Sequence, residues 1–443
     1  MVLGLVLMAA VKQSVTADAW SLATAAAPYK GVNVSAVALD RPSYVAERAL
    51  LPEFERETGI HVSLTTYPYE STLEAETLNF VSKSDQYDAI LSDIVWLGTF
   101  ASTPGWVVPL EKFMRDPKLA DPALDVHDFF PVWQQAFTWK HKLYGLPFDS
   151  YSGLLYYNRC MLQKAGFNRP PRTWHELRDV YAPKLTDPAH RHYAYALQSM
   201  YGETQTADAF SRFIWDFGGG WFKPGGTQPT LASPQSIAGI EYRHSLLKYM
   251  PPGIVGDDHP QVVQLMAQGQ VAMLTEWSSF YTTLAEPGTS KIGSCLGVTT
   301  EPAGPGGAIP ALGGFAYMIN GQSPTAKQNA AWLFIQWLTS KKLAKPLVAK
   351  GAVVARTSFD TDPAMQQKYP FLKPMVEGWG HARADWRPQI AQYPEMSEVV
   401  ANWGTLIEQG GIGVQDGMEK IQTSIHAILV RNGYDTGGAG GER

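Results

Sequence analysis

The sequence predicts an α/β fold, because segments typical of strands and of helices alternate along the beginning of the chain. The first strand-like segment is the short apolar run from Val32 to Leu39. A helical stretch follows it as far as Thr58, and Gly59 stands where a glycine commonly ends a helix. With 443 residues, the chain is long enough for two or three domains.

Two more strands complete this initial pattern. The segment from Ile60 to Thr65 alternates apolar and polar residues, as a strand does. Residues from Ser71 to Ser84 show the apolar spacing of a helix, and Tyr87 to Leu91 is a third apolar run. This order predicts an open sheet, whose ligand crevice lies at the carboxyl ends of the strands. Four polar residues fall at or near such ends: Asp40, Tyr69, Glu70 and Asp93.

Composition excludes several classes of protein. Apolar residues make up 45% of the chain and charged residues 17%, the opposite of the balance in a disordered protein. The net charge of -5 argues against a nucleic-acid partner, which would require a basic surface. Two cysteines exclude a disulfide scaffold and a multi-cysteine metal cluster.

The N-terminus predicts export. Val2 to Val11 is an apolar run too short to span a bilayer. Two patterns of small residues, Ala17 to Ala19 and Ala25 to Ala27, resemble signal-peptide cleavage sites, although no basic residue precedes the apolar run. We therefore expect residues 1–27 to be an export signal or its remnant, and an ordinary terminus is the alternative. No cysteine lies near this zone, so we expect a periplasmic protein without a lipid anchor.

Searches for catalytic and metal-binding motifs give nothing. The chain contains no phosphate-binding loop of the GxxxxGK[ST] type, no HExxH, no CxxC and no GxSxG. His190 and His192 fall on a predicted loop without the spacing of metal ligands. We therefore expect no catalytic residue, no cofactor and no metal.

Six segments, in order along the chain, resemble a known family. They are QYDAILSD (Gln86 to Asp93), GWVVPLEKF (Gly105 to Phe113), KLYGLPFDSYSGLLYYNRCMLQKAG (Lys142 to Gly166), PPRTWHEL (Pro170 to Leu177), GQVAMLTEW (Gly269 to Trp277) and GGFAYMING with its following helix (Gly313 to Lys342). Their order resembles extracellular solute-binding protein family 1 of ABC importers, the group of maltose-binding protein. The resemblance extends from about Gly31 to Tyr434, and RPQIAQYPEMSEVV (Arg387 to Val400) looks like the sugar and polyol branch.

The resemblance implies a two-lobed periplasmic binding protein fold of the maltose-binding type. Each lobe is then an open sheet flanked by helices, and the lobes close on a ligand about the crossings between them. We expect the crossings near Pro147 to Tyr151, Lys291 to Val298 and Thr339 to Leu343. The corresponding division gives lobe I as 30–147 and 292–340, lobe II as 148–291 and 341–436, and a flexible tail as 437–443.

The function implied by the resemblance is capture of a sugar, oligosaccharide or sugar alcohol by a monomeric, non-enzymatic protein. Its partners would be that ligand and the membrane permease subunits of an ABC importer. One alternative is an anionic sugar derivative or glycerophosphate-type ligand, for which Arg356, Arg383 and Arg387 would be candidate contacts. Another is a secreted glycoside hydrolase, which also combines tryptophan stacking with carboxylates.

A sugar site requires particular side chains. Buried hydroxyls need hydrogen-bond partners, and carboxylates accept hydroxyl protons in strong bonds. The CH faces of a sugar are apolar and lie on aromatic rings. The candidate ligand contacts are Asp40, Tyr44, Glu70, Asp93, Asp149, Tyr151, Trp277, Gly313, Gly314, Trp379, Trp386 and Arg387.

Each candidate also has a purely structural interpretation. Trp277, which the family pattern places against the ligand, could be a core residue. Asp40 could form a turn before Pro42, Glu70 could be an ordinary acid in the first turn of a helix, and Asp93 could cap the next segment. The glycines Gly313 and Gly314 could allow close approach of the ligand or mark a bulge.

Two local features of the chain, a helix start and a pair of cysteines, give further expectations. Thr173 and Glu176 have the spacing of a capping box that starts a helix. Cys160 and Cys295 both lie in apolar contexts, where thiols behave as small hydrophobic groups, so we predict no disulfide between them.

Overall fold

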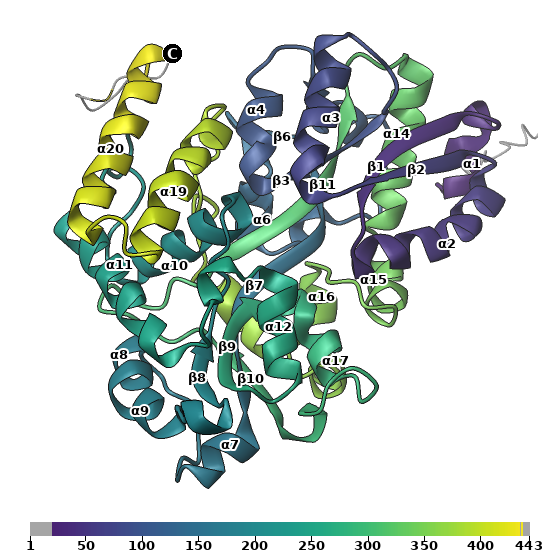
Figure 1. Cartoon of the computed structure of the whole chain (residues 1–443). Coiled ribbons are helices and arrows are strands. Elements are labelled where there is room, and N and C mark those ends of the chain that lie inside the picture. The colour runs from purple at the N-terminus through teal and green to yellow at the C-terminus, as the bar shows by residue number, and fades with distance from the viewer. Residues whose placement is uncertain (1–19, 435, 437–443) are drawn as a thin grey trace, which may run out of the picture.

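The computed structural model describes residues 20–434 and 436, and its strands follow one path in the order β2-β1-β3-β11-β7-β9-β8 (Figure 1). In addition, β4 pairs with β11, β10 pairs with β7, and β5 and β6 form a separate pair. The strands are β1 (Asn33–Leu39), β2 (His61–Tyr67), β3 (Ala89–Asp93), β4 (Val107–Val108), β5 (Thr138–Trp139), β6 (Lys142–Leu143), β7 (Leu146–Asn158), β8 (Tyr193–Ala196), β9 (Val271–Trp277), β10 (Leu296–Thr300) and β11 (Leu312–Asn320).

Helices flank this sheet along its whole length. The helices before residue 220 are α1 (Leu22–Ala26), α2 (Pro42–Thr58), α3 (Tyr69–Val81), α4 (Leu97–Ala101), α5 (Glu111–Met114), α6 (Pro131–Ala136), α7 (Arg159–Lys164), α8 (Trp174–Glu176), α9 (Ala182–Leu185) and α10 (Asp208–Asp216). Those after it are α11 (Pro234–Leu246), α12 (His259–Ala267), α13 (Tyr281–Ala285), α14 (Thr325–Leu338), α15 (Lys341–Val348), α16 (Thr357–Asp360), α17 (Pro363–Lys368), α18 (Leu372–Trp379), α19 (Tyr393–Glu408) and α20 (Val414–Arg431).

The first three strands confirm the elements expected from the sequence. Strand β1 pairs in parallel with β2, Val34 opposite Val62, and in parallel with β3. Helix α2 ends at Thr58, and Gly59 adopts the left-handed conformation with φ 70°, which glycine reaches without a side-chain penalty. The carboxyl ends of the three strands therefore lie at one edge of the sheet.

Strand β7 joins the two lobes. Its first part, 146–152, pairs with β11, and its second part, 153–158, pairs with β9 on one side and β10 on the other. We call the side of β1, β2, β3 and β11 the first lobe and the side of β8, β9 and β10 the second lobe. The predicted first crossing, Pro147 to Tyr151, lies on β7 just before this change of partners.

The later crossings lie further along the chain than we predicted. Residues 296–300 form β10, which pairs with the second part of β7, so the chain leaves the second lobe through 301–311 and not at Lys291 to Val298. Helix α15 contacts α2 of the first lobe, although 341 onward was assigned to lobe II. Both differences depend on contacts between segments far apart in the sequence, the pairing of β10 with β7 and the packing of α15 on α2, which leave no local pattern.

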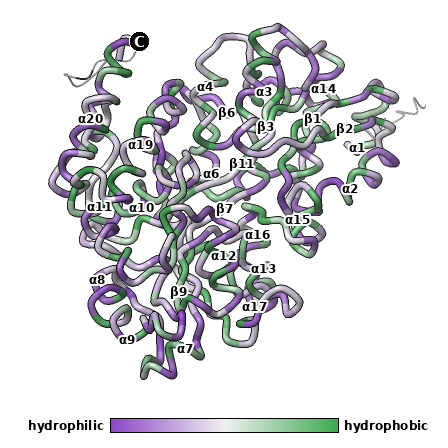
Figure 2. The backbone as a smooth tube through the Cα atoms, viewed as in Figure 1, coloured by the Kyte–Doolittle hydropathy of each residue, from purple (hydrophilic) through white to green (hydrophobic). Residues whose placement is uncertain are grey.

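Helix α20 is amphipathic. In α20, which packs against α19, hydrophilic and hydrophobic residues alternate along the backbone (Figure 2). Met418, Ile421, Ile425 and Leu429 recur at helical spacing and are buried. In the part of the chain that the structure describes, no helix combines the length and the apolar character needed to cross a membrane.

The N-terminal helix belongs to the first lobe. Helix α1 contacts α2 and α14, and Leu22, Ala25 and Ala26 are buried. The last residues of the predicted export signal, 1–27, thus pack against the first lobe in this structure, and the extent of that signal stays a prediction. Residues 1–19, which hold the rest of that prediction, and the predicted tail 437–443 lie outside the described residues.

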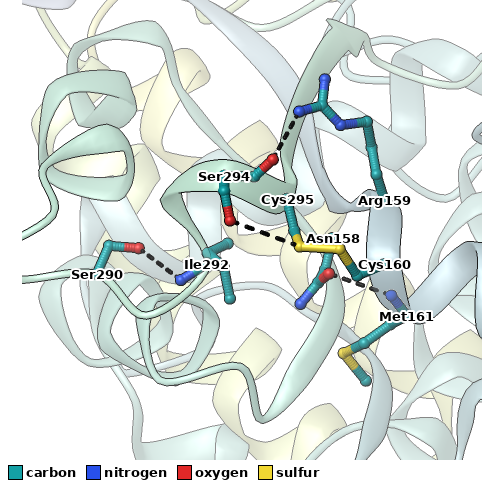
Figure 3. Close-up of a disulfide and its surroundings, with 8 residues drawn as sticks. All are labelled: Asn158, Arg159, Cys160, Met161, Ser290, Ile292, Ser294 and Cys295. Atoms are coloured by element: carbon teal, nitrogen blue, oxygen red, sulfur yellow. Dashed lines mark hydrogen bonds between the residues drawn. A yellow bond between two sulfur atoms is a disulfide. The ribbon is translucent and has the colours of Figure 1, made fainter.

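Cys160 and Cys295 form a disulfide, with their Cα atoms 5.5 Å apart, so our prediction of two free thiols is wrong (Figure 3). The physical reason is strand register. Strand β10 pairs antiparallel with β7, with Leu296 opposite Asn158, and this pairing brings Cys295 beside the start of α7. The two cysteines are 135 residues apart in the sequence, so only the pairing of the strands reveals their proximity.

The expected capping box at the start of α8 is half present. The Thr173 hydroxyl accepts a hydrogen bond from the backbone N–H of Glu176 over 3.1 Å. The Glu176 carboxylate, however, accepts from the backbone N–H of Arg172 and pairs with Arg169, so it does not return to Thr173.

Candidate functional site

A cavity of about 360 Å³ lies where the two lobes meet, within the range of small-molecule sites. First-lobe and shared-strand residues on its wall are Asp40, Arg41, Pro42, Ser43, Tyr69, Glu70, Asp93, Tyr151, Gly313, Gly314, Phe315 and Gly351. The remaining wall residues are Met200, Thr204, Gln205, Asp258, His259, Pro260, Trp277, Ser279, Phe280, Thr283 and Arg387.

The first-lobe wall is built at the ends of parallel strands, as the sequence predicted. Asp40 follows β1, Glu70 lies in the first turn of α3 directly after β2, and Asp93 ends β3. Asp40 and Glu70 are exposed, whereas Asp93 is buried. Asp93 also accepts a hydrogen bond from the backbone N–H of Val95 and so caps the 3-10 turn that follows β3. The alternative that Asp93 caps the next segment is therefore correct as well. Contact of these carboxylates with a ligand remains a prediction.

Asp93 is part of a polar group that joins the lobes, which we call the interlobe cluster: Tyr69, Asp93, Glu203, Arg387 and Tyr393. The Tyr69 hydroxyl lies 3.1 Å from Asp93 Oδ2 and 3.0 Å from Glu203 Oε2. Arg387 Nη1 donates to Glu203 Oε1 over 2.6 Å, its Nη2 lies 3.8 Å from Asp93 Oδ1, and the Tyr393 hydroxyl donates to Glu203 over 2.6 Å. Burial raises the pKa of Asp93 to about 6, although the Arg387 charge opposes the shift.

Trp277 lies at the end of β9 and is held on three sides. Its backbone N–H donates to Glu276 Oε2 over 2.7 Å, and its carbonyl accepts from the Tyr156 hydroxyl over 2.9 Å. Its ring lies 6.2 Å from that of Tyr151 and directly against Gly313, where a Cβ would come within 2.8 Å of Trp277 Cη2. The partly exposed indole is thus a fixed apolar surface on the cavity wall.

Asp149 lies behind the wall and does not line the cavity. Its carboxylate is completely buried and accepts hydrogen bonds from the hydroxyls of Ser43 and Tyr151, which do line it. Burial raises the pKa of Asp149 to about 7, and the Ser43 hydrogen bond opposes the shift. Because both hydroxyls donate their protons to Asp149, they offer lone pairs to a ligand. Asp149 therefore orients two wall residues without lining the cavity itself, and a direct contact of its own with a ligand stays a prediction.

Three aromatic candidates also lie away from the cavity. Tyr44 is buried edge-on against Phe148, with ring centroids 5.6 Å apart. Trp379 is buried against Trp133, and Trp386 is buried edge-on against Trp277. Tyr44, Trp379 and Trp386 are thus buried in the core and do not line the cavity, and their contact with a ligand stays a prediction.

Several wall residues escaped the sequence analysis. Arg41 directly follows Asp40, so its position after a buried strand was the signal that could have found it. His259 is the first residue of α12. Because Asp258 and Gln261 form a capping box there, the sequence around His259 resembles an ordinary helix start. Its Nδ1 hydrogen-bonds to Glu276, and its Nε2 lies 2.8 Å from the Thr204 carbonyl. Burial alone would lower the pKa of His259, but the charge and hydrogen bond of Glu276 raise it.

The combined chemistry suits a neutral, hydroxyl-rich molecule. Carboxylates and hydroxyl lone pairs can accept protons from ligand hydroxyls, and Trp277, Phe280 and Phe315 supply apolar faces. Among residues 20–434 and 436, no three His, Cys, Asp or Glu side chains converge in a way that could hold a metal ion.

Comparison with known proteins matches this architecture. Residues 40–345 match the family model described as bacterial extracellular solute-binding protein. A "probable ABC transporter-binding protein" of Deinococcus radiodurans is 28% identical over 66% of this chain and 67% of its own length. The erythritol/L-threitol-binding protein of Mycolicibacterium smegmatis is 22% identical over 75% of this chain and 72% of its own.

Solved structures agree on the fold. A crystal structure of an ABC transporter solute-binding protein of Agrobacterium radiobacter K84 in complex with ribitol superposes with a TM-score of 0.82. It is 27% identical and covers 90% of this chain and 99% of its own. Maltose-bound MalE3 of T. maritima, at 22% identity, superposes with a TM-score of 0.80 over 90% of this chain and all of its own.

Proposed function

The chain belongs to the bacterial extracellular solute-binding proteins, the non-enzymatic substrate-binding components of ABC importers, and on this premise we propose that it captures a neutral sugar or sugar alcohol. The ligand would bind in the cavity between the lobes, and the protein would deliver it to permease subunits in the membrane. We also propose that the protein is exported to the periplasm and acts there as a monomer.

The composition of the cavity wall carries this proposal. Asp40, Glu70 and Asp93 provide acceptors for hydroxyl protons, and the Ser43 and Tyr151 hydroxyls, oriented by Asp149, add lone pairs. Opposite them, the Trp277 indole offers a flat surface for the CH face of a ring or an extended polyol. The names of relatives that bind erythritol or ribitol support the same ligand class.

The three candidate arginines do not favour an anionic ligand, although Arg41, which was not a candidate, also lines the cavity with its guanidinium 5.5 Å from the Tyr69 ring centroid. Arg356 is buried and donates to backbone carbonyls of Thr339 and Leu124, away from the cavity wall. Arg383 pairs with Asp385 and is also absent from the wall. Arg387 lines the cavity but already faces Glu203 and Asp93, so its charge is compensated.

A thermal-shift screen tests the proposal directly. The panel comprises ribitol, D-mannitol, D-tagatose, maltose and maltotriose, with glycerol 3-phosphate as the anionic comparison. A ligand at one hundred times its dissociation constant stabilises the folded protein by about 2.7 kcal/mol, which shifts the melting temperature measurably. We expect at least one neutral compound to do so. Stabilisation by glycerol 3-phosphate alone, or by no compound of the panel, would contradict the proposal.

A further inference from the structure

One irregular segment lies between the cavity and a second, larger hollow. Residues 383–391 connect α18 to α19, and we call them the strap. Arg387 lines the inner cavity of about 360 Å³, whereas Arg383, Pro388 and Gln389 line an outer groove of about 800 Å³. A single stretch of chain thus forms a wall of both spaces.

The strap is tied to the first lobe by its backbone and by one side chain. Gln389 Nε2 donates to the carbonyl of Ala136 over 2.7 Å and to that of Ile94 over 3.1 Å. At Gly98, a Cβ would lie only 2.3 Å from the Gln389 carbonyl oxygen, so the strap packs directly on the backbone of α4. These contacts fix the strap against the first lobe.

The strap is also tied to the second lobe. The indole N–H of Trp215 donates to the Trp386 carbonyl over 2.7 Å, and the Trp386 side chain is buried. Arg387 donates to Glu203 over 2.6 Å and lies 3.8 Å from Asp93 of the first lobe. The carboxylates of Glu203 and Asp93 both face the guanidinium of Arg387, and these two contacts hold the strap in place.

From these contacts we infer that the strap ends the binding cavity and limits the ligand to one sugar unit or one short polyol, with Arg387 as the specificity-determining residue. The inner volume lies near the lower end of the range of small-molecule sites, about 300 to 1,000 Å³. On the side of the outer groove, the strap occupies the path that a longer oligosaccharide would take. This inference rests on the proposed function, because it concerns the length of the hydroxylated ligand.

The test is a length series measured by titration calorimetry. Ribitol, D-mannitol and D-tagatose are the short probes, and maltotriose is the long one. For the unaltered protein we expect maltotriose to bind at least a hundredfold more weakly than the best short probe. In Arg387→Ala, loss of the side chain opens the wall toward the groove, and the ratio of the two dissociation constants should fall at least tenfold.

Arg383→Ala is the matched control, because Arg383 lies on the same strap but lines only the outer groove, and it should leave the ratio unchanged. If circular dichroism shows that Arg387→Ala is unfolded, Gln389→Ala, which frees the strap from the first lobe, takes its place with the same expected result. Equal binding of maltotriose and the best short probe by the unaltered protein overturns the inference while the proposed function stands. The inference is also overturned if the folded variant, Arg387→Ala or its substitute Gln389→Ala, shows the same ratio of dissociation constants as the unaltered protein. Absence of binding by every probe overturns both.

Discussion

The two walls of the cavity are built in different ways. The first-lobe wall takes its polar residues from the ends of three parallel strands that follow one another closely, at Asp40, Glu70 and Asp93. The second-lobe wall assembles Trp277 from β9, His259 from α12 and the strap, which come from separate stretches of the chain. The first wall therefore depends on local strand order, whereas the second depends on long-range packing that must be held in place.

Removal of the disulfide should have the largest effect of the changes that probe this difference. The bond cross-links residues of the second lobe alone. A bond between residues 135 apart restricts the unfolded chain, and such bonds typically contribute about 2–4 kcal/mol to stability. We expect the double variant Cys160→Ser with Cys295→Ser to lose about that much free energy of unfolding in urea. Its affinity for the best ligand should be unchanged, since neither cysteine lines the cavity.

Alkylation of the unfolded, non-reduced protein gives an independent control for the disulfide. No label should be incorporated if the bond is formed, and two labels should appear after reduction. Two labels before reduction would show free thiols, and an unaltered stability of the double variant would show that the second lobe does not need the cross-link.

The Trp277 side chain is the next test, since it is the main apolar surface of the second wall. Loss of one well-placed aromatic contact should weaken binding by about 2 kcal/mol or more, by analogy with interface hot spots. The free energy of unfolding of Trp277→Ala should fall by less than the about 3–5 kcal/mol of a fully buried tryptophan, because this ring is only partly buried. Calorimetry and urea unfolding give the two values.

Trp403→Ala is a suitable control for Trp277→Ala, because Trp403 is also partly buried but lies on α19 away from the cavity wall. It should leave affinity unaltered. If Trp277→Ala binds normally but unfolds much more easily, Trp277 is a core residue and its assignment to the site fails.

The same contrast explains what the sequence could predict. The alternation in β1 and β2 and the glycine that ends α2 at Gly59 are local patterns, so those elements were predicted correctly. The polar residues after the strands lie on the cavity wall. Tyr44 was a candidate because it follows the first strand, and Asp149 because it lies on the predicted first crossing. The side chains of both residues are buried in the core. His259 and the disulfide depend on distant pairing, for which a single sequence holds no signal.

The smallest expected effect concerns the place where the two walls touch. Gly313 lies on β11 of the first lobe, and a Cβ there would approach the Trp277 ring to 2.8 Å at Cη2 and 3.1 Å at Cζ3. The β11 backbone cannot easily retreat, because Gly313 pairs with Tyr151 of β7, and the Trp277 backbone is held by Glu276 and Tyr156. The ring itself must therefore shift in Gly313→Ala.

This shift should weaken binding by less than the loss of the whole ring, by about 1 kcal/mol, which corresponds to roughly a fivefold change in the dissociation constant. Gly256→Ala is the matched control, since a Cβ at Gly256 meets nothing within 4 Å. Neither glycine has the positive φ that would strain an alanine, so the two variants differ only in what the added methyl group contacts. Calorimetric titration of both variants with the best ligand measures the difference. Equal affinities of Gly313→Ala and Gly256→Ala would mean that the position of the Trp277 ring does not govern binding. The two walls would then act independently of each other.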